Sequence, residues 1–227
     1  MARLSGFPLA AAHYRQGELA LAERHCLAAL KRDPTNSNGL QLLGVIQLRQ
    51  NNATAAAATF DRLLKLTPNA PAVLLNRAIA LQQLKRFDEA LASLDRALEV
   101  RPDYGEALNN RSSVLLLLRR YDEALECADR ALVLAPDSIA ALFNRTAALR
   151  ELQRNDEALA CIDRVLILQP GSTDALSQKG ALLYSLGRLE DAAATFEDLL
   201  KRDPKQVGLR GLIFELKLGV CDWSDYD

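Results

Sequence analysis

The chain has 227 residues and a formal net charge of −1, because 28 Lys and Arg nearly balance 29 Asp and Glu. A chain this close to neutral does not attract a polyanion as a whole, so we expect no non-specific binding to nucleic acid. No stretch is apolar for long enough to span a membrane, and the first residues lack the apolar core of a signal peptide, so we expect no membrane partner.

Two residue types recur every 34 positions along most of the chain. The prolines are Pro34, Pro68, Pro102, Pro136, Pro170 and Pro204, and the alanines are Ala22, Ala56, Ala90, Ala124, Ala158 and Ala192. A repeat with this spacing resembles the tetratricopeptide repeat (TPR), in which each repeat is a hairpin of two helices. The resemblance implies an all-α fold, a right-handed TPR superhelix (alpha-solenoid) of six helical hairpins followed by a half-repeat.

The period divides residues 3–206 into six repeats. These are 3–36, 37–70, 71–104, 105–138, 139–172 and 173–206. The first repeat is irregular, because Gly6 and Pro8 stand where its first helix should begin, and we expect that helix to start near Leu9. Residues 207–227 begin a seventh helix without a complete partner, so we expect a truncated cap there and a boundary inside a longer architecture.

The repeat 71–104 shows how one hairpin folds. Its first half places Leu74, Ala78 and Leu81 on one apolar stripe of a helix, and its second half repeats that pattern around Ala90. A polar turn at 85–86 separates the two helices. Small residues such as Ala78 and Ala90 let the backbones approach closely, so a larger side chain there would overpack the contact.

Neither the histidines nor the cysteines form a pattern that indicates catalysis. His13 and His25 have no partner set for acid–base work, so we interpret both as structural, with His25 exposed. The cysteines are Cys26, Cys127, Cys161 and Cys221, and they lack the paired spacing of a metal site. We interpret them as small buried residues rather than as a disulfide or a site, which predicts a reducing, cytoplasmic setting with no metal and no cofactor.

Position 6 of successive repeats, counted from the first residue of each, carries a side-chain amide. The series is Asn76, Asn110, Asn144 and Gln178. An amide both donates and accepts hydrogen bonds, so a column of amides on the inner face of the first helices predicts binding of an extended peptide backbone. The alternative is that these amides bond to neighbouring helices and tie the repeats together. Further residues expected in the same groove are Leu75, Ile79, Phe143 and Tyr184.

Position 7 changes together with position 25 of the preceding repeat. The first such pair is Leu27 and Leu43, and the later pairs are Asp61–Arg77, Asp95–Arg111, Asp129–Arg145 and Asp163–Lys179. We predict that each Asp forms a salt bridge across a repeat junction. The alternative is that both series are solvated and match only because duplication copied them.

The segment 220–227 and the amide series resemble one family of TPR proteins. The sequence Val-Cys-Asp-Trp-Ser-Asp-Tyr-Asp, with Trp223 after a helical half-repeat, is similar to the junction of bacterial O-GlcNAc transferase-like (SPINDLY-type) glycosyltransferases. The resemblance implies a parent enzyme that transfers N-acetylglucosamine from a UDP-sugar to Ser or Thr, and an asparagine ladder that binds its polypeptide substrate. The chain departs from the family at position 6 of the first two repeats, which holds Pro8 and Leu42, and in its position-7 arginines.

Three functions remain open at the sequence level. The first is the substrate-recruiting arm of such a transferase, without catalysis in this chain, because residues 1–227 contain no nucleotide-binding fingerprint and no catalytic base. The second is a free-standing TPR adaptor that binds a protein or peptide. The third is an oligomerisation module that uses the second helices, whose outer faces look polar around Asp122, Glu126 and Arg164.

Overall fold

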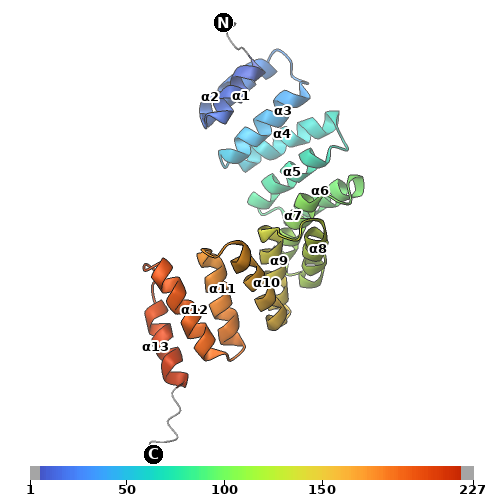
Figure 1. The fold of residues 1–227 in the computed structure, drawn as a ribbon. Helices are drawn as coiled ribbons and strands as arrows, with labels where there is room; N and C mark the ends of the chain where they lie inside the picture. Colours follow the sequence, from blue (N-terminus) through green and yellow to red (C-terminus); the bar gives the residue numbers. More distant parts are fainter. Residues whose placement is uncertain (1–5, 221–227) are drawn as a thin grey trace, which may run out of the picture. The chain divides into compact units, whose positions relative to one another are not determined.

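The computed structural model describes residues 6–220, and this range contains thirteen α-helices and no strand (Figure 1). The helices are α1 (Phe7–Arg15), α2 (Leu19–Leu30), α3 (Ser37–Arg49), α4 (Ala53–Leu66), α5 (Pro71–Gln83), α6 (Phe87–Val100), α7 (Gly105–Leu117), α8 (Tyr121–Leu134), α9 (Ile139–Glu151), α10 (Asn155–Leu168), α11 (Thr173–Ser185), α12 (Leu189–Arg202) and α13 (Leu209–Val220). The expected all-α class is therefore confirmed. From α3 to α12, equivalent helices begin 34 residues apart.

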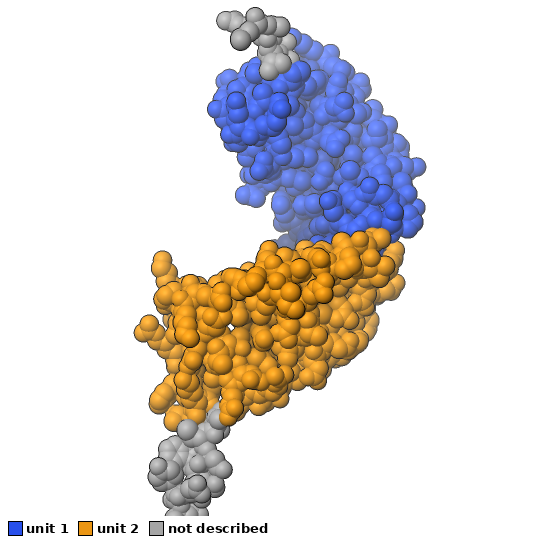
Figure 2. Space-filling view, viewed as in Figure 1, with its two compact units in different colours: residues 1–118 blue, residues 119–227 orange. Residues whose placement is uncertain are grey.

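The chain forms two compact units, residues 1–118 and residues 119–227 (Figure 2). Unit 1 contains the hairpins α1–α2, α3–α4 and α5–α6, followed by α7. Unit 2 contains α8, the hairpins α9–α10 and α11–α12, and then α13, which packs against α12. The boundary falls between α7 and α8, inside the expected repeat 105–138, and the division of residues 3–206 into six repeats stays a prediction from the sequence.

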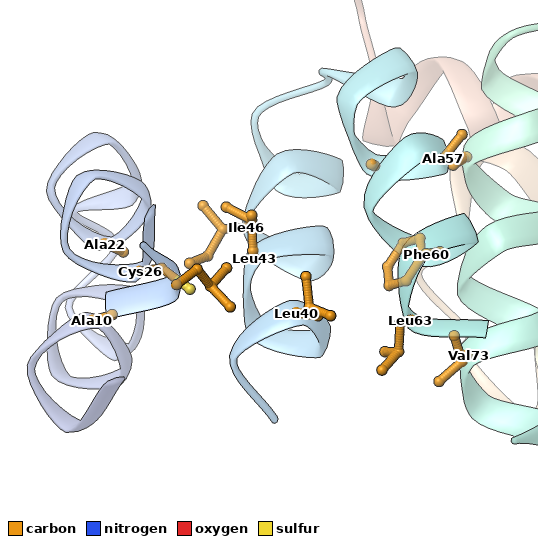
Figure 3. Close-up of a cluster of buried hydrophobic side chains, with 13 residues drawn as sticks. Ala10, Ala22, Cys26, Leu40, Leu43, Ile46, Ala57, Phe60, Leu63 and Val73 are labelled. Carbon is orange, nitrogen blue, oxygen red and sulfur yellow. The ribbon is translucent and has the colours of Figure 1, made fainter. Parts of the chain in front are cut away.

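Small residues allow the two helices of a hairpin to approach closely. Gly44 on α3 lies against Phe60 on α4, and a Cβ atom at this glycine would come within 2.5 Å of the phenyl ring. The ring is fully buried in the core of unit 1 beside Leu63 (Figure 3). In the next hairpin Ala78 and Ala90 are 1% and 0% exposed. The hairpins therefore have no room for added volume at these positions.

The first hairpin differs from the sequence expectation in two places. Helix α1 begins at Phe7 rather than near Leu9, because Gly6 takes a positive φ before it and a proline fits the first helical turn, where its missing N–H is not needed. His25 is half-buried rather than exposed. Its ring stacks on that of His13 with 5.2 Å between centroids, and His13 also contacts Glu18. The stack packs α1 against α2.

Each turn between the two helices of a hairpin contains one residue with left-handed backbone geometry. In the repeats that begin at residues 37, 71, 105 and 139 this residue is not glycine, and its φ is between 58° and 61°. The residues are Asn51, Lys85, Arg119 and Gln153, and glycine takes the equivalent place at Gly17 and Gly187. The sequence predicts a polar turn at 85–86 but not this conformation, which L-residues with a Cβ rarely adopt.

Candidate functional site

The position-6 amides are half-buried in their respective units. In unit 1, Asn110 donates from Nδ2 to the carbonyl oxygen of Glu106 at 2.8 Å, one turn earlier in its own helix. Asn144 in unit 2 is also engaged in an interaction. The amides of Asn76 and Gln178 make no hydrogen bond with the described part of the chain. These two amides are thus the members of the series with donors and acceptors to offer a ligand.

The role of tying first helices together belongs to another pair in unit 1. Gln82 on α5 donates from Nε2 to the hydroxyl oxygen of Ser113 on α7 at 3.2 Å. The sequence alternative gave this role to the position-6 amides, whereas Gln82 and Ser113 stand at positions 12 and 9 of their repeats. A polar bond between first helices therefore exists without using Asn76.

The other expected groove residues differ in what they expose. Ile79 and Phe143 are half-buried, and Tyr184 is 55% exposed, so each has surface that a ligand can reach. Leu75 is a correction to the expectation, because its side chain is only 5% exposed. An apolar side chain at this place gains free energy by leaving water, and Leu75 is therefore part of the core and not of a binding surface.

Unit 2 contains a pocket of about 280 Å³ between α9 and α11. Two of its lining residues, Phe143 and Gln178, belong to the expected groove, and the other two are Asp174 and Ser177. The pocket thus combines an aromatic ring, a side-chain amide, a hydroxyl and a carboxylate. Sequence reasoning missed Asp174 and Ser177, although the repeat register could have found them, since they occupy positions 2 and 5, one turn before and directly beside the position-6 amide.

The structure brings together each of the four expected ion pairs. The shortest N···O distances are 2.6 Å for Asp61–Arg77, 2.7 Å for Asp95–Arg111, 2.6 Å for Asp129–Arg145 and 2.8 Å for Asp163–Lys179. The Asp side chains are about half exposed, and pairs of this kind each contribute roughly 0.2–1 kcal/mol to stability. Their role is therefore in stacking the repeats and not in chemistry.

The position-7 arginines also contact the second helix of their own repeat. Arg77 donates from Nη1 to the hydroxyl of Ser93 at 2.6 Å, and Arg145 donates from Nη1 to Sγ of Cys161 at 2.9 Å. Burial lowers the pKa of the Arg145 guanidinium, but its hydrogen bonds with Asp129 and Cys161 outweigh burial and hold that pKa above its ordinary value. One guanidinium therefore joins three helices, which the sequence pairing did not reveal.

A second set of arginines at position 26 escaped the sequence interpretation. Arg62 donates to the carbonyl of Pro34 at 3.4 Å and Arg96 to that of Pro68 at 3.0 Å, both 28 residues earlier. In unit 2 the equivalent Arg164 pairs with Asp137 at 2.6 Å. These arginines recur every 34 residues, and this recurrence could have identified them from the sequence. They fix the loop that ends one repeat to the second helix of the next.

The described residues offer no site for metal or thiol chemistry. Within residues 6–220, no group of three His, Cys, Asp or Glu could hold a metal ion. Cys26, Cys127 and Cys161 are buried and form no disulfide, and Cys221 lies outside the described residues. Burial raises the pKa of Cys26 to about 11, so its thiol is a poor nucleophile near neutral pH. No helix in this range is long and apolar enough to cross a membrane.

Comparison with known proteins establishes the family. One tetratricopeptide repeat family model matches residues 7–71 and 75–139, and a second matches residues 145–212. The chain is a tetratricopeptide repeat protein. The family consists of protein-interaction scaffolds, and the matched residues of this chain are all of repeat type. A comparison with curated proteins gives no match.

Solved TPR structures share the fold at low sequence identity. A TPR protein from Parabacteroides merdae is 23% identical, with a TM-score of 0.76 over 92% of this chain and 83% of its own. PilF from Pseudomonas aeruginosa is 18% identical, with a TM-score of 0.77 over 92% and 95%. YrrB, described as a TPR protein with an unusual peptide-binding site, is 20% identical, with a TM-score of 0.68 over 85% and 97%. These likenesses establish the architecture of the repeats.

Proposed function

We propose that this TPR protein binds extended peptide segments on the first helices of its repeats. The observation that carries the proposal is the pocket between α9 and α11, where the amide of Gln178 and the ring of Phe143 line one surface. In unit 1 the unengaged amide of Asn76 and the half-buried Ile79 offer a similar combination on α5. Each of these surfaces presents an amide for peptide backbone and an apolar group for a side chain.

Binding of this kind is weak per contact and tolerant of sequence. An amide that donates to a backbone carbonyl and accepts from an N–H contributes roughly 0.5–1.5 kcal/mol per hydrogen bond. Such bonds do not read side chains, whereas Asp174 favours a ligand with a positive charge near Gln178. We therefore expect selectivity for extended segments with a basic residue, and not for one fixed motif.

The proposal has a finer form, in which the chain recruits substrates for an O-GlcNAc transferase-like protein. Its support is the resemblance of residues 220–227 to the junction in that family, together with the amides at position 6. Residues 221–227 lie outside the described part of the chain. In this form the transfer of N-acetylglucosamine belongs to a region of the parent protein beyond residues 1–227, and this chain only holds the acceptor. The alternative form is a free-standing adaptor.

The experiment is a calorimetric titration of the protein with Ser/Thr-rich acceptor peptides. Replacing Phe143 and Gln178 together by Ala should weaken binding at least about tenfold, since it removes an aromatic contact and one or two hydrogen bonds. The control is Gln169→Ala, an exposed glutamine outside the pocket. Equal affinity in the double variant, with melting unchanged, would exclude this surface. For the finer form, the natural protein is assayed for transfer from UDP-N-acetylglucosamine to the same peptides.

One observation favours self-association as a second function. Val133 and Ile167 occupy position 29 of adjacent repeats on α8 and α10, and they are 81% and 74% exposed. Leu134 beside them is 45% exposed. The outer faces of these second helices are therefore not polar throughout, contrary to the expectation from Asp122 and its neighbours. Light scattering tests this candidate function by measuring the molar mass of the protein in solution. Self-association predicts an oligomer for the unsubstituted protein and a monomer for the Val133→Ser/Ile167→Ser variant.

A further inference from the structure

Unit 1 contains a hollow of about 480 Å³ on its second helices, and no position-6 amide is among its lining residues. Helices α2 and α4 line it. Its floor is apolar and consists of Leu27, which is 43% exposed, together with Ala28 and the buried Leu30. The remaining lining residues are Arg24, Lys31 and Arg62. The hollow thus has three cations around an apolar floor and no carboxylate in its lining.

The hollow occurs where the first repeat lacks two residues that later repeats contain. Position 25 is Leu27 in the first repeat, whereas the second repeat has Asp61, whose carboxylate is 2.6 Å from Arg77. Position 26 is Ala28, whereas the second repeat has Arg62. A short side chain leaves space at position 26, and the apolar side chain at position 25 adds no carboxylate to the lining of the hollow.

The three cations are available to a ligand. Arg24, Lys31 and Arg62 are exposed, and none of them makes an ion pair with another described residue. Arg62 is nevertheless held in place, because its Nη2 donates to the carbonyl oxygen of Pro34 at 3.4 Å. A guanidinium that is oriented by one backbone contact retains further N–H donors for a carboxylate.

We propose that this hollow binds an acidic peptide segment that carries an apolar side chain. The apolar side chain covers Leu27 and Ala28, and carboxylates on both sides of it pair with Lys31, Arg24 and Arg62. Charge complementarity selects the acidic segment, since three cations and no acid line the site, and the apolar floor selects a peptide with a Leu or Phe. The site is separate from the first-helix surface, so the chain has two docking surfaces of opposite charge preference.

A nucleic acid or an anionic membrane fits these observations less well. The cations surround a single hollow and do not form a row that follows a phosphate backbone, and the chain as a whole carries a net charge of −1. Stable attachment to a membrane surface also requires a wider apolar face than one hollow provides. An acidic peptide needs only the charges and the floor that the hollow offers.

The test uses fluorescence anisotropy with the labelled peptide Glu-Asp-Phe-Glu-Leu-Asp-Glu and residues 1–227 of the protein. Two control peptides replace either the acids by Gln or the Phe and Leu by Ala, and both should bind at least about tenfold more weakly. Lys31→Glu and Leu27→Asp should each weaken binding of the first peptide about tenfold, because one reverses a charge and the other supplies the missing acid.

The second repeat provides a matched control. Lys65 occupies the same position as Lys31, but the carboxylate of Asp61 stands at position 25 of that repeat. Lys65→Glu should therefore leave the affinity within about twofold of the unsubstituted protein. Equal losses for Lys31→Glu and Lys65→Glu would contradict the proposal, because they would indicate a general charge effect. Arg24→Glu repeats the test if Lys31→Glu lowers the melting temperature.

Two further measurements test whether an anionic membrane or a nucleic acid binds in the hollow instead. Vesicles of phosphatidylcholine and phosphatidylserine and a single-stranded oligonucleotide are titrated under the same conditions. Tighter binding of either, lost in Lys31→Glu, would overturn the peptide assignment. The Phe143→Ala/Gln178→Ala variant should bind the acidic peptide normally, so failure of the first-helix proposal and failure of this one give different results.

Discussion

The junction between the first two repeats differs from the later junctions in the side chains that it uses, although equivalent helices stack at each. At the first junction, position 7 is Leu43, which is 1% exposed in the core of unit 1. At the second junction, the same position is Arg77, which pairs with Asp61 and also donates to Ser93. Either an apolar or a charged side chain at position 7 is therefore compatible with the stacking of neighbouring repeats. Stacking itself does not require the salt bridges, which add polar contacts at the surface of a core that exists without them.

Truncating the buried side chain at the apolar junction should have the largest effect on stability. Leu43→Ala should lower the free energy of unfolding by about 2–5 kcal/mol, because it removes a fully buried side chain and leaves a cavity. Urea denaturation followed by circular dichroism measures the loss. The control is Leu27→Ala, since Leu27 is 43% exposed, and it should cost less than about 1 kcal/mol. Equal losses would show that the junction is not a packed core.

Removing one salt bridge between repeats should cause a smaller loss of stability. Arg145→Ala should cost about 1–2 kcal/mol, because both Asp129 and Cys161 lose a hydrogen-bond partner. Arg164→Ala removes a more exposed pair with Asp137, and the expected loss is below about 0.5 kcal/mol. Chemical denaturation separates the two variants. A smaller loss for Arg145→Ala than for Arg164→Ala would contradict the three-helix role of position 7.

The turns of the middle repeats and the turn of the last repeat differ in whether their left-handed residue is glycine. Lys85→Gly should raise the free energy of unfolding by about 1 kcal/mol, because Lys85 has a φ of 58° and glycine adopts that geometry without a Cβ penalty. Gly187→Ala, at the equivalent turn with a φ of 72°, should lower it by a similar amount. Thermal melts of the two variants should shift in opposite directions, and shifts of the same sign would rule out the backbone explanation.

The smallest expected effect is on the pH dependence of stability, and it arises from helices that differ in the charge of their first turns. Helices α6 and α10 begin with Arg86–Glu89 and Arg154–Glu157 pairs, whereas α2 and α4 have no acid in their first turns. The hydrogen bond from each Arg lowers the pKa of its Glu below the ordinary value of 4.5. A lowered pKa in the folded state adds stability that is complete above the ordinary pKa and is lost as the pH falls through the folded value.

A double variant, Glu89→Gln/Glu157→Gln, tests this dependence. It should lose less stability than the unsubstituted protein between about pH 5 and pH 3, because its two side chains no longer take up protons there. Both glutamates are exposed, so the difference is small and is best measured as a shift in melting temperature at each pH. Parallel pH profiles for the two proteins would show that these pairs contribute nothing.

The regular parts of the fold could be predicted from the sequence because each repeat confirms the others. The 34-residue spacing is enough to place the helices, and the joint change of positions 7 and 25 predicts pairs that the structure brings within 2.8 Å. The irregular first repeat could not be predicted in this way. The start of α1 depends on Gly6 and Pro8, which have no counterpart in later repeats, so the period carried no information about it.

The candidate site was less predictable, because periodicity places a residue on a helix without deciding what covers it. Leu75 and Phe143 both occupy position 5, yet the first is buried and the second lines a pocket. Neighbouring side chains decide this difference, and it follows from packing rather than from spacing. The contact of Arg145 with Cys161 could not be predicted for the same reason, since Cys161 looked like a small core residue in the sequence.

Peptide binding on the first helices is tested by an NMR titration of the labelled protein with an extended Ser/Thr-rich peptide that contains one basic residue. Peptide binding on the first helices predicts that the side-chain amide signals of Asn76 and Gln178 shift on titration, together with the backbone signals of α9 and α11. The amide of Gln169, outside the pocket, should stay unchanged. Shifts confined to the second helices, with the side-chain amides of Asn76 and Gln178 unmoved at saturation, would contradict peptide binding on the first helices.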